Sequence, residues 1–186
     1  MIVTAPAFLD ACVLIPVNLT DVLLRPAGLH AFRPLWSAQV LDEVRRNLPR
    51  ASATITPERA TRRVAAMRTA FPQAEGTDYE WLMPVLTNAP EDRHVLAAAV
   101  HGGAEVIVTA NLNDFRPRDL REHGVAATHP DAFLVDLLDE DPELISQCLR
   151  DAVLARRRPP DPIDSLPAQL GEVVPDFAEA ARRSMR

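Results

Sequence analysis

Apolar residues along the chain follow two alternating patterns, short unbroken runs and longer stretches with an apolar residue every three or four positions. The short runs are typical of buried strands and the longer stretches of amphipathic helices. The predicted strands cover residues 7–9, 104–110 and 125–128. The predicted helices cover residues 16–28, 38–48, 57–71, 92–103, 116–124 and 130–140. This alternation predicts an α/β fold, with a central parallel sheet flanked by helices on both faces.

Capping residues mark the expected ends of two helices. Ser37 is expected to cap the helix that follows it, and Pro49 to close that helix. The apolar stripe between them comprises Val40, Leu41, Val44 and Leu48. Thr56 and Pro57 mark the start of the next helix, because Pro is favoured at the first helical position.

Acidic residues follow two of the predicted strands. Asp10 ends the first apolar run, and Asp114 lies in the turn after the second. Since ligands bind outside the carboxyl ends of parallel strands, both acids are expected at one edge of the sheet. Glu43, from a helix, and Asp92, from the first turn of another, can join them there. The sequence therefore predicts four acids converging from distant parts of the chain.

Four crowded carboxylates repel one another unless a cation neutralises them. A set of oxygen ligands favours Mg²⁺ or Mn²⁺, because zinc sites normally include histidine or cysteine. The natural chemistry of such a site is hydrolysis of phosphodiesters. Four carboxylates are compatible with one metal ion or two.

Each acid also has an ordinary structural interpretation. Asp10 and Asp114 suit turns or caps, and Asp92 suits a helix N-terminus. Glu43 suits a solvated helix surface, as does its neighbour Asp42. The metal-site interpretation therefore depends on the four acids as a set.

Two histidines and a cysteine close to these acids offer alternatives. His94 and His101 are interpreted as separate structural residues, because joint ligation from one helix favours a spacing of three or four. Cys12 stands where a haloacid-dehalogenase-like phosphatase would need a second aspartate after Asp10. That alternative is disfavoured.

Composition narrows the function classes. The chain has 186 residues, of which 47% are hydrophobic and 25% charged, as in a globular protein with a sizeable core. A net charge of −6 argues against a non-specific nucleic-acid coat. Cys12 and Cys148 share no metal-type spacing and are expected to be reduced thiols. A cytoplasmic location is expected, because there is neither a convincing signal peptide nor a membrane span.

All basic residues are arginines, and many of them lie on the helices predicted at 38–48 and 57–71. A solvated basic face is the ordinary interpretation. The alternative is contact with an RNA backbone beside the acidic site. The candidates for RNA binding are Arg46, Arg62, Arg63, Arg93 and Arg116. Few aromatic residues are available for base stacking, and Trp36 and Trp81 are expected in the core or at an interface.

The last part of the chain has a different pattern. An amphipathic helix over 142–158 ends in three arginines, residues 159–165 form a stiff break, and residues 166–186 suit one or two short helices. Such helices need a surface to pack on, which could be the domain, a second copy or a partner. The domain boundaries are therefore expected as 1–140 and 141–186.

The sequence resembles PIN-domain ribonucleases, particularly the VapC-like toxins of bacterial toxin–antitoxin systems. The matching segments are "FLDACVL", "SAQVLDEVRRNL" and "EDRHVLAAAVHGGAEVIVTANLNDF", together with the helix that follows. The last block is the most specific, since an acid, an alanine-rich helix, a strand and "TANLNDF" occur in the family's order.

This resemblance implies a metal-dependent endoribonuclease that leaves 5′-phosphate and 3′-hydroxyl ends. The implied metal-binding and catalytic residues are Asp10, Glu43, Asp92 and Asp114, and Thr109 and Asn111 would support them by hydrogen bonding. The implied partners are RNA, a co-encoded antitoxin that masks the acidic site and, often, a second copy. The remaining hypotheses are a PIN-like module that binds RNA or protein without cutting and the unrelated phosphatase.

Overall fold

The structure is a computed structural model that describes residues 5–155 and 165–184 of the chain. The described residues form two compact units. The first comprises residues 5–16 and 32–129, and the second comprises residues 17–31, 130–155 and 165–184. The domain boundary expected at residue 140 stays a prediction.

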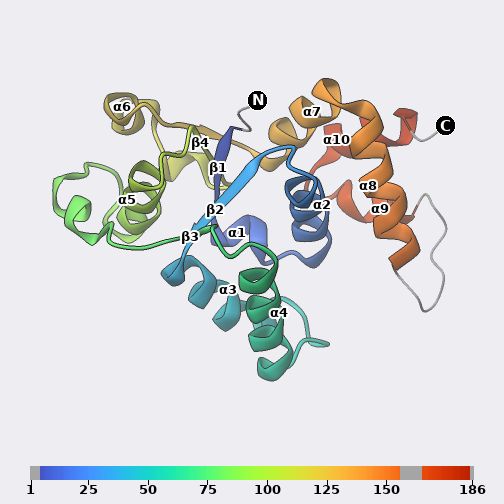
Figure 1. The fold of residues 1–186 in the computed structure, drawn as a ribbon, viewed down its shortest axis with the longest axis horizontal. Coiled ribbons are helices and arrows are strands. Elements are labelled where there is room, and N and C mark those ends of the chain that lie inside the picture. The colour runs from blue at the N-terminus through green and yellow to red at the C-terminus, as the bar shows by residue number, and fades with distance from the viewer. Residues whose placement is uncertain (1–4, 156–164, 185–186) are drawn as a thin grey trace. The chain divides into compact units, whose positions relative to one another are not determined.

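The first unit is built on five parallel strands in the order β3-β2-β1-β4-β5 (Figure 1). The strands are β1 (Pro6–Leu9), β2 (Arg33–Ser37), β3 (Glu75–Gly76), β4 (Val106–Val108) and β5 (Ala126–Thr128). The chain runs outward from β1 to β3 and then crosses back to β4 and β5. The predicted α/β fold with a parallel sheet is confirmed.

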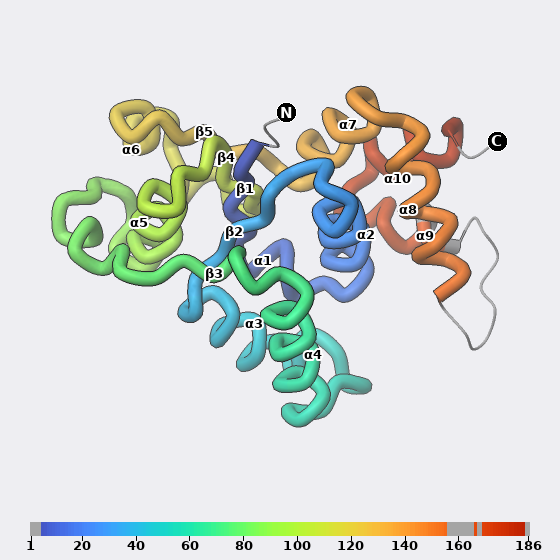
Figure 2. The backbone as a smooth tube through the Cα atoms, viewed as in Figure 1, coloured from blue at the N-terminus to red at the C-terminus, as the bar shows by residue number. Residues whose placement is uncertain are grey.

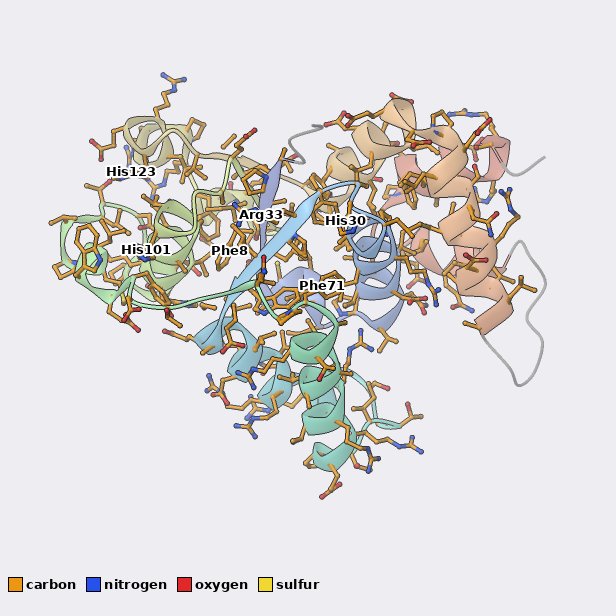
Figure 3. All side chains as sticks on the ribbon, viewed as in Figure 1. Phe8, His30, Arg33, Phe71, His101 and His123 are labelled. Atoms are coloured by element: carbon orange, nitrogen blue, oxygen red, sulfur yellow. The ribbon has the colours of Figure 1, made fainter. Side chains whose placement is uncertain are left out.

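Strand β1 lies at the centre of the sheet and is buried along its whole length. Ala7 is paired with Pro34 of β2 on one side and with Val106 of β4 on the other. Phe8, labelled in Figure 3, is 1% exposed. Burial on both faces explains why this strand is a continuous apolar run without alternation.

The first unit contains five described α-helices and four short 3₁₀ helices. The α-helices are α1 (Ala11–Leu14), α3 (Ala38–Ala51), α4 (Pro57–Ala70), α5 (Arg93–His101) and α6 (Pro117–Leu120). The 3₁₀ helices are η1 (Glu80–Val85), η2 (Pro90–Asp92), η3 (Leu112–Asp114) and η4 (Arg121–His123). Helix α3 packs against α4 and α1, and α5 packs against β2 and β4.

Helix α3 begins as expected but ends later. The Ser37 hydroxyl accepts a hydrogen bond from the Val40 N–H at 3.1 Å, and the whole apolar stripe is fully buried. The expectation that Pro49 closes the helix is wrong, since α3 continues to Ala51. Proline removes one N–H, but the residues after it can still donate, and Ser52 N–H bonds to Leu48 C=O at 3.2 Å.

The two tryptophans have different environments. Trp36 is fully buried and packs edge-on against Phe71 at a ring separation of 5.8 Å. Trp81 is 67% exposed and lies edge-on to His101, which Figure 3 labels on α5. The core position is therefore confirmed for Trp36, whereas Trp81 lies outside the core and its place at an interface stays a prediction.

The second unit is helical. Its described helices are α2 (Val17–Gly28), α7 (Pro130–Glu140), α8 (Pro142–Ala155), α9 (Ser165–Leu170) and α10 (Pro175–Ser184). Helix α7 packs against α8 and α10, and α2 packs against α8 and α9 (Figure 2). The helices expected in the tail are present. The three arginines at 156–158, and all of the expected break except Ser165, lie outside the described residues.

A side chain from α7 caps the N-terminus of α10. The Asp131 carboxylate accepts hydrogen bonds from the N–H groups of Asp176 and Phe177, at 3.1 and 2.8 Å. A carboxylate at a helix N-terminus satisfies free N–H groups and is favoured by the helix dipole. This contact ties the last described helix to the start of α7. No helix in the described part of the chain is long and apolar enough to cross a membrane.

Replacing Ser37 by Ala is expected to lower the free energy of unfolding of the first unit by about 1 kcal/mol, because the cap of α3 is lost. Both tryptophans lie in this unit, so their fluorescence during urea unfolding reports on it. Gln39→Ala, at an exposed position two residues after Ser37, is the control and should change stability by less than about 0.5 kcal/mol. Equal stability of the two variants would contradict the capping role.

Candidate functional site

Asp10 lies at the carboxyl end of the central strand. Leu9 is in register with Val108 of β4, and the Asp10 N–H extends this ladder by bonding to the Val108 carbonyl at 3.2 Å. The order of the strands reverses between β1 and β4, which is where open parallel sheets form their binding crevice. The pairing therefore places Asp10 beside Thr109 at that crevice.

The Asp10 carboxylate is buried, with 7% of the residue exposed, and three groups hold it. One oxygen accepts from the Ala11 N–H at 2.6 Å, which caps α1. The other accepts from the Thr109 hydroxyl at 2.7 Å and from the Cys12 thiol at 3.1 Å. These contacts fix the orientation of the carboxylate.

Thr109 and Cys12 also hold the loop that follows β4. The Thr109 hydroxyl accepts from the Asn111 N–H at 3.0 Å, and the Cys12 sulfur accepts from the Ala110 N–H at 3.2 Å. Asn111 thus takes part through its backbone, and the residue itself is exposed. The loop continues into η3, where Asp114 N–H bonds to the Asn111 carbonyl at 3.1 Å. The "TANLND" segment is therefore a hydrogen-bonded turn attached to Asp10.

Cys12 acts in this network as a protonated thiol. Burial and the adjacent charge of Asp10 raise the pKa of the Cys12 thiol from 9.0 to about 12. The thiol therefore keeps its proton at neutral pH and can donate to Asp10. Cys12 and Cys148 are both free in the structure.

Asp92 is half-buried at the N-cap position of α5 and is close enough to two other acids for their charges to affect it. Burial, followed by the charges of Asp114 and Asp10, raises the pKa of the Asp92 carboxyl from 3.8 to about 6. Asp10, Asp92 and Asp114 are therefore close enough for their charges to interact. This crowding disfavours the state in which all three carboxylates are ionised.

Glu43, the fourth acid, reaches the same region through a histidine. Its Oε1 lies 3.2 Å from Nε2 of His94, and the Glu43 side chain is 27% exposed whereas that of His94 is 5% exposed. The charge of His94 in turn favours the ionised form of Asp92 and lowers its pKa. His94 therefore contacts Glu43 directly and is close enough to Asp92 for its charge to affect that carboxyl.

The donor chemistry of this cluster fits a hard divalent cation, because the four acids supply only oxygen and three of them repel one another. Among the described residues, no three His, Cys, Asp or Glu side chains are already arranged to hold a metal ion. The carboxylates of Asp10, Asp92 and Asp114 therefore lie near one another without surrounding a single ion position. The metal-binding roles of Asp10, Glu43, Asp92 and Asp114 stay predictions.

The five arginines predicted to bind RNA differ in their surroundings. Arg46 is exposed and forms an ion pair with Asp42 at 2.9 Å. Arg62 is exposed on α4, where Arg63 is half-buried. Arg93, the residue after Asp92, donates to the Asn88 carbonyl at 3.3 Å. Arg116 is exposed between Asp114 and α6.

Two residues outside the predicted set, His94 and Cys12, contact the predicted acids. In the sequence, His94 suits an ordinary structural role, and Cys12 only departs from a phosphatase motif. For His94, the available signal was a polar residue within the buried alanine-rich run of α5. For Cys12, no pattern predicted the contact, because it depends on the pairing of β1 with β4.

Comparison with known proteins gave matches to both parts of the chain. A family model described as PIN domain matches residues 6–113, and one described as VapC50 C-terminal domain matches residues 130–183. A protein of Mycobacterium tuberculosis (strain ATCC 25618 / H37Rv) named "Putative ribonuclease VapC50" is 46% identical over 105 residues. This match covers 56% of the chain and 62% of the relative, which is less than two thirds of the relative's length. No solved structure matched the chain.

Replacing Thr109 by Val is expected to lower the free energy of unfolding by about 2 kcal/mol. The change keeps the shape of the side chain but removes one of the three donors to the buried Asp10 carboxylate and leaves the Asn111 N–H without its acceptor. Thr109→Ser keeps the hydroxyl and should stay within about 1 kcal/mol of the wild type. Urea unfolding followed by tryptophan fluorescence measures both values, and equal losses in the two variants would contradict this role of the hydroxyl.

Replacing Asp92 by Asn is expected to stabilise the chain in EDTA above pH 6. A pKa raised to about 6 means that the folded state resists ionisation, so the wild type loses stability as the pH rises from about 4 to 6. The shift corresponds to about 3 kcal/mol if taken in full, and solvent screening of this half-exposed group reduces the expected gain to about 1 kcal/mol. Below pH 4 the two proteins should unfold alike. An Asp92→Asn variant less stable than the wild type at pH 8 would contradict the crowding of these carboxylates.

Proposed function

Because the chain belongs to the PIN domain family, whose model matches residues 6–113, we propose that it is a divalent-metal-dependent endoribonuclease. The observation that carries this proposal is the approach of Asp10, Asp92 and Asp114 at the carboxyl edge of β1 and β4, where burial and then the charges of Asp114 and Asp10 raise the pKa of Asp92. The relative whose name includes ribonuclease supports RNA as the substrate.

In this proposal, Asp10, Asp92 and Asp114 hold Mg²⁺ or Mn²⁺, and Glu43 completes the set of acids. Asp10 is the best-anchored ligand, since Thr109, Cys12 and the Ala11 N–H orient its carboxylate. A bound divalent ion would polarise the attacking water and stabilise negative charge on the phosphoryl oxygens. Attack of water on phosphorus would break the bond to the 3′ oxygen and leave 5′-phosphate and 3′-hydroxyl ends.

The chain's own residues have distinct tasks in this reaction. The turn from Thr109 to Asp114 positions Asp114. This turn is fixed because the Ala110 N–H bonds to the Cys12 sulfur and the Asn111 N–H bonds to the Thr109 hydroxyl. Glu43 is more exposed than Asp10 and can accept a proton from water at the edge of the site. Positive charge for the RNA backbone would come from Arg46, Arg62, Arg63, Arg93 and Arg116.

We also propose that the chain is the toxin of a toxin–antitoxin pair and acts in the cytoplasm. The VapC50 C-terminal domain match at residues 130–183 supports the assignment to a toxin–antitoxin pair. Its partners would be an antitoxin that places a basic side chain over the acidic site, and a second copy of the chain. The helices of the second unit offer the surfaces on which such partners can pack.

Asp10→Asn and Asp92→Asn are each expected to lower RNA cleavage by at least about 100-fold, because one negative ligand is lost. The measurement is cleavage of total cellular RNA with Mg²⁺, with Mn²⁺ and with EDTA. Asp78→Asn removes one charge from an exposed position of the same unit and should leave cleavage unchanged. Full activity in both site variants would exclude the assignment, and RNA binding without cleavage by the wild type would favour the non-catalytic module.

Changing Arg62 and Arg63 to Glu is expected to weaken RNA binding at least tenfold and to reduce its salt dependence, because contacts with phosphates are lost. Fluorescence anisotropy with a labelled single-stranded RNA, at several salt concentrations in EDTA, measures both. Changing Arg182 and Arg183 to Glu in α10 alters the net charge equally and serves as the control. If both double variants bind equally, α4 carries only a solvated basic face.

A further inference from the structure

His94 occupies a position that packing alone does not explain. It belongs to the buried face of α5, where the residues that follow it are all apolar (Val95, Leu96, Ala97, Ala98 and Ala99). The residue is 4% exposed, so its imidazole ring is withdrawn from water. Burying a polar ring is unfavourable unless hydrogen-bond partners replace the lost water.

Only one of the two ring nitrogens has such a partner among the described residues. Nε2 lies 3.2 Å from Oε1 of Glu43, whereas Nδ1 is buried and unpaired. A carboxylate can only accept, so the nitrogen that faces Glu43 is the one that carries a proton. The ring is therefore directed toward Glu43, at the cost of an unsatisfied nitrogen on its other side.

Glu43 needs little from this contact for stability. Its side chain is 27% exposed, so water can solvate the carboxylate if the ring is removed. The backbone carbonyl of Glu43 accepts from Asn47 Nδ2 at 2.9 Å, and helix α3 is anchored by its own cap and apolar stripe. The contact with His94 therefore serves mainly to orient the Glu43 carboxylate and contributes little to the stability of helix α3.

We infer that His94 is a positioning residue that fixes the Glu43 carboxylate at the start of α5, where it can serve as a ligand of the divalent cation. The inference rests on the proposed function. In this inference, His94 on α5 orients Glu43 on α3, whose partly exposed carboxylate could otherwise turn toward solvent. Partners of this kind outside the set of ligands typically contribute ten- to 100-fold in metal affinity.

The test measures Mn²⁺ affinity by isothermal titration calorimetry at pH 7.5, alongside thermal unfolding in EDTA. His94→Leu fills the apolar pocket without a donor and is expected to weaken Mn²⁺ binding by about ten- to 100-fold, while the unfolding temperature stays within a few degrees. His94→Gln can place an amide N–H near the position of Nε2 and should recover most of the affinity. A residue with only a structural role would instead lower the unfolding temperature and leave Mn²⁺ affinity unchanged.

A double-variant cycle decides whether His94 acts through Glu43. In the Glu43→Ala background, His94→Leu should change Mn²⁺ affinity less than twofold, because the carboxylate that it orients is absent. The same loss in both backgrounds would overturn the inference. Tight Mn²⁺ binding by the wild type with equal binding by His94→Leu would overturn the inference but leave the proposed function intact. No Mn²⁺ binding by the wild type would overturn both.

Discussion

The parallel pairing of β1 with β4 is the constraint on which the acidic site depends. Leu9 and Val108 are in register, so the chain leaves both strands at the same level and Asp10 meets Thr109. A slip of one residue would turn every side chain of β1 to the opposite face of the sheet and remove Asp10 from the Thr109 hydroxyl. The backbone ladder thus determines which side chains can reach the crevice, before any cation is involved.

The electrostatics of the site oppose the stability of the fold that contains it. Asp92 resists ionisation because it is partly buried and near two other acids, and the imidazole of His94 is buried with one nitrogen unpaired. Both features are unfavourable in a chain selected for stability alone. Strain of this kind is concentrated where a site must meet a ligand of opposite charge. The hydrogen bonds around Asp10 hold the most buried of the four predicted acids.

The sequence allowed the fold class and the main helices to be predicted, because their apolar periods and caps are local signals. Strand β2 was missed, since Pro34 argues against a strand, and β3 is too short to leave a pattern. The acids could be proposed because Asp10 and Asp114 follow apolar runs. The connection of Glu43 to His94 could not, since it depends on the packing of α3 and α5 around the sheet.

Helix α2 belongs to the second unit although it lies between the first two strands of the first unit in the sequence. Its partners within that unit, α8 and α9, are synthesised more than a hundred residues later. On the ribosome, the apolar face of α2 therefore emerges long before the helices that cover it exist. Because a bare helix of this length is marginal in water, the second unit can be completed only after α8 and α9 have been synthesised. The order of synthesis thus makes α2 a segment that needs shielding in the nascent chain.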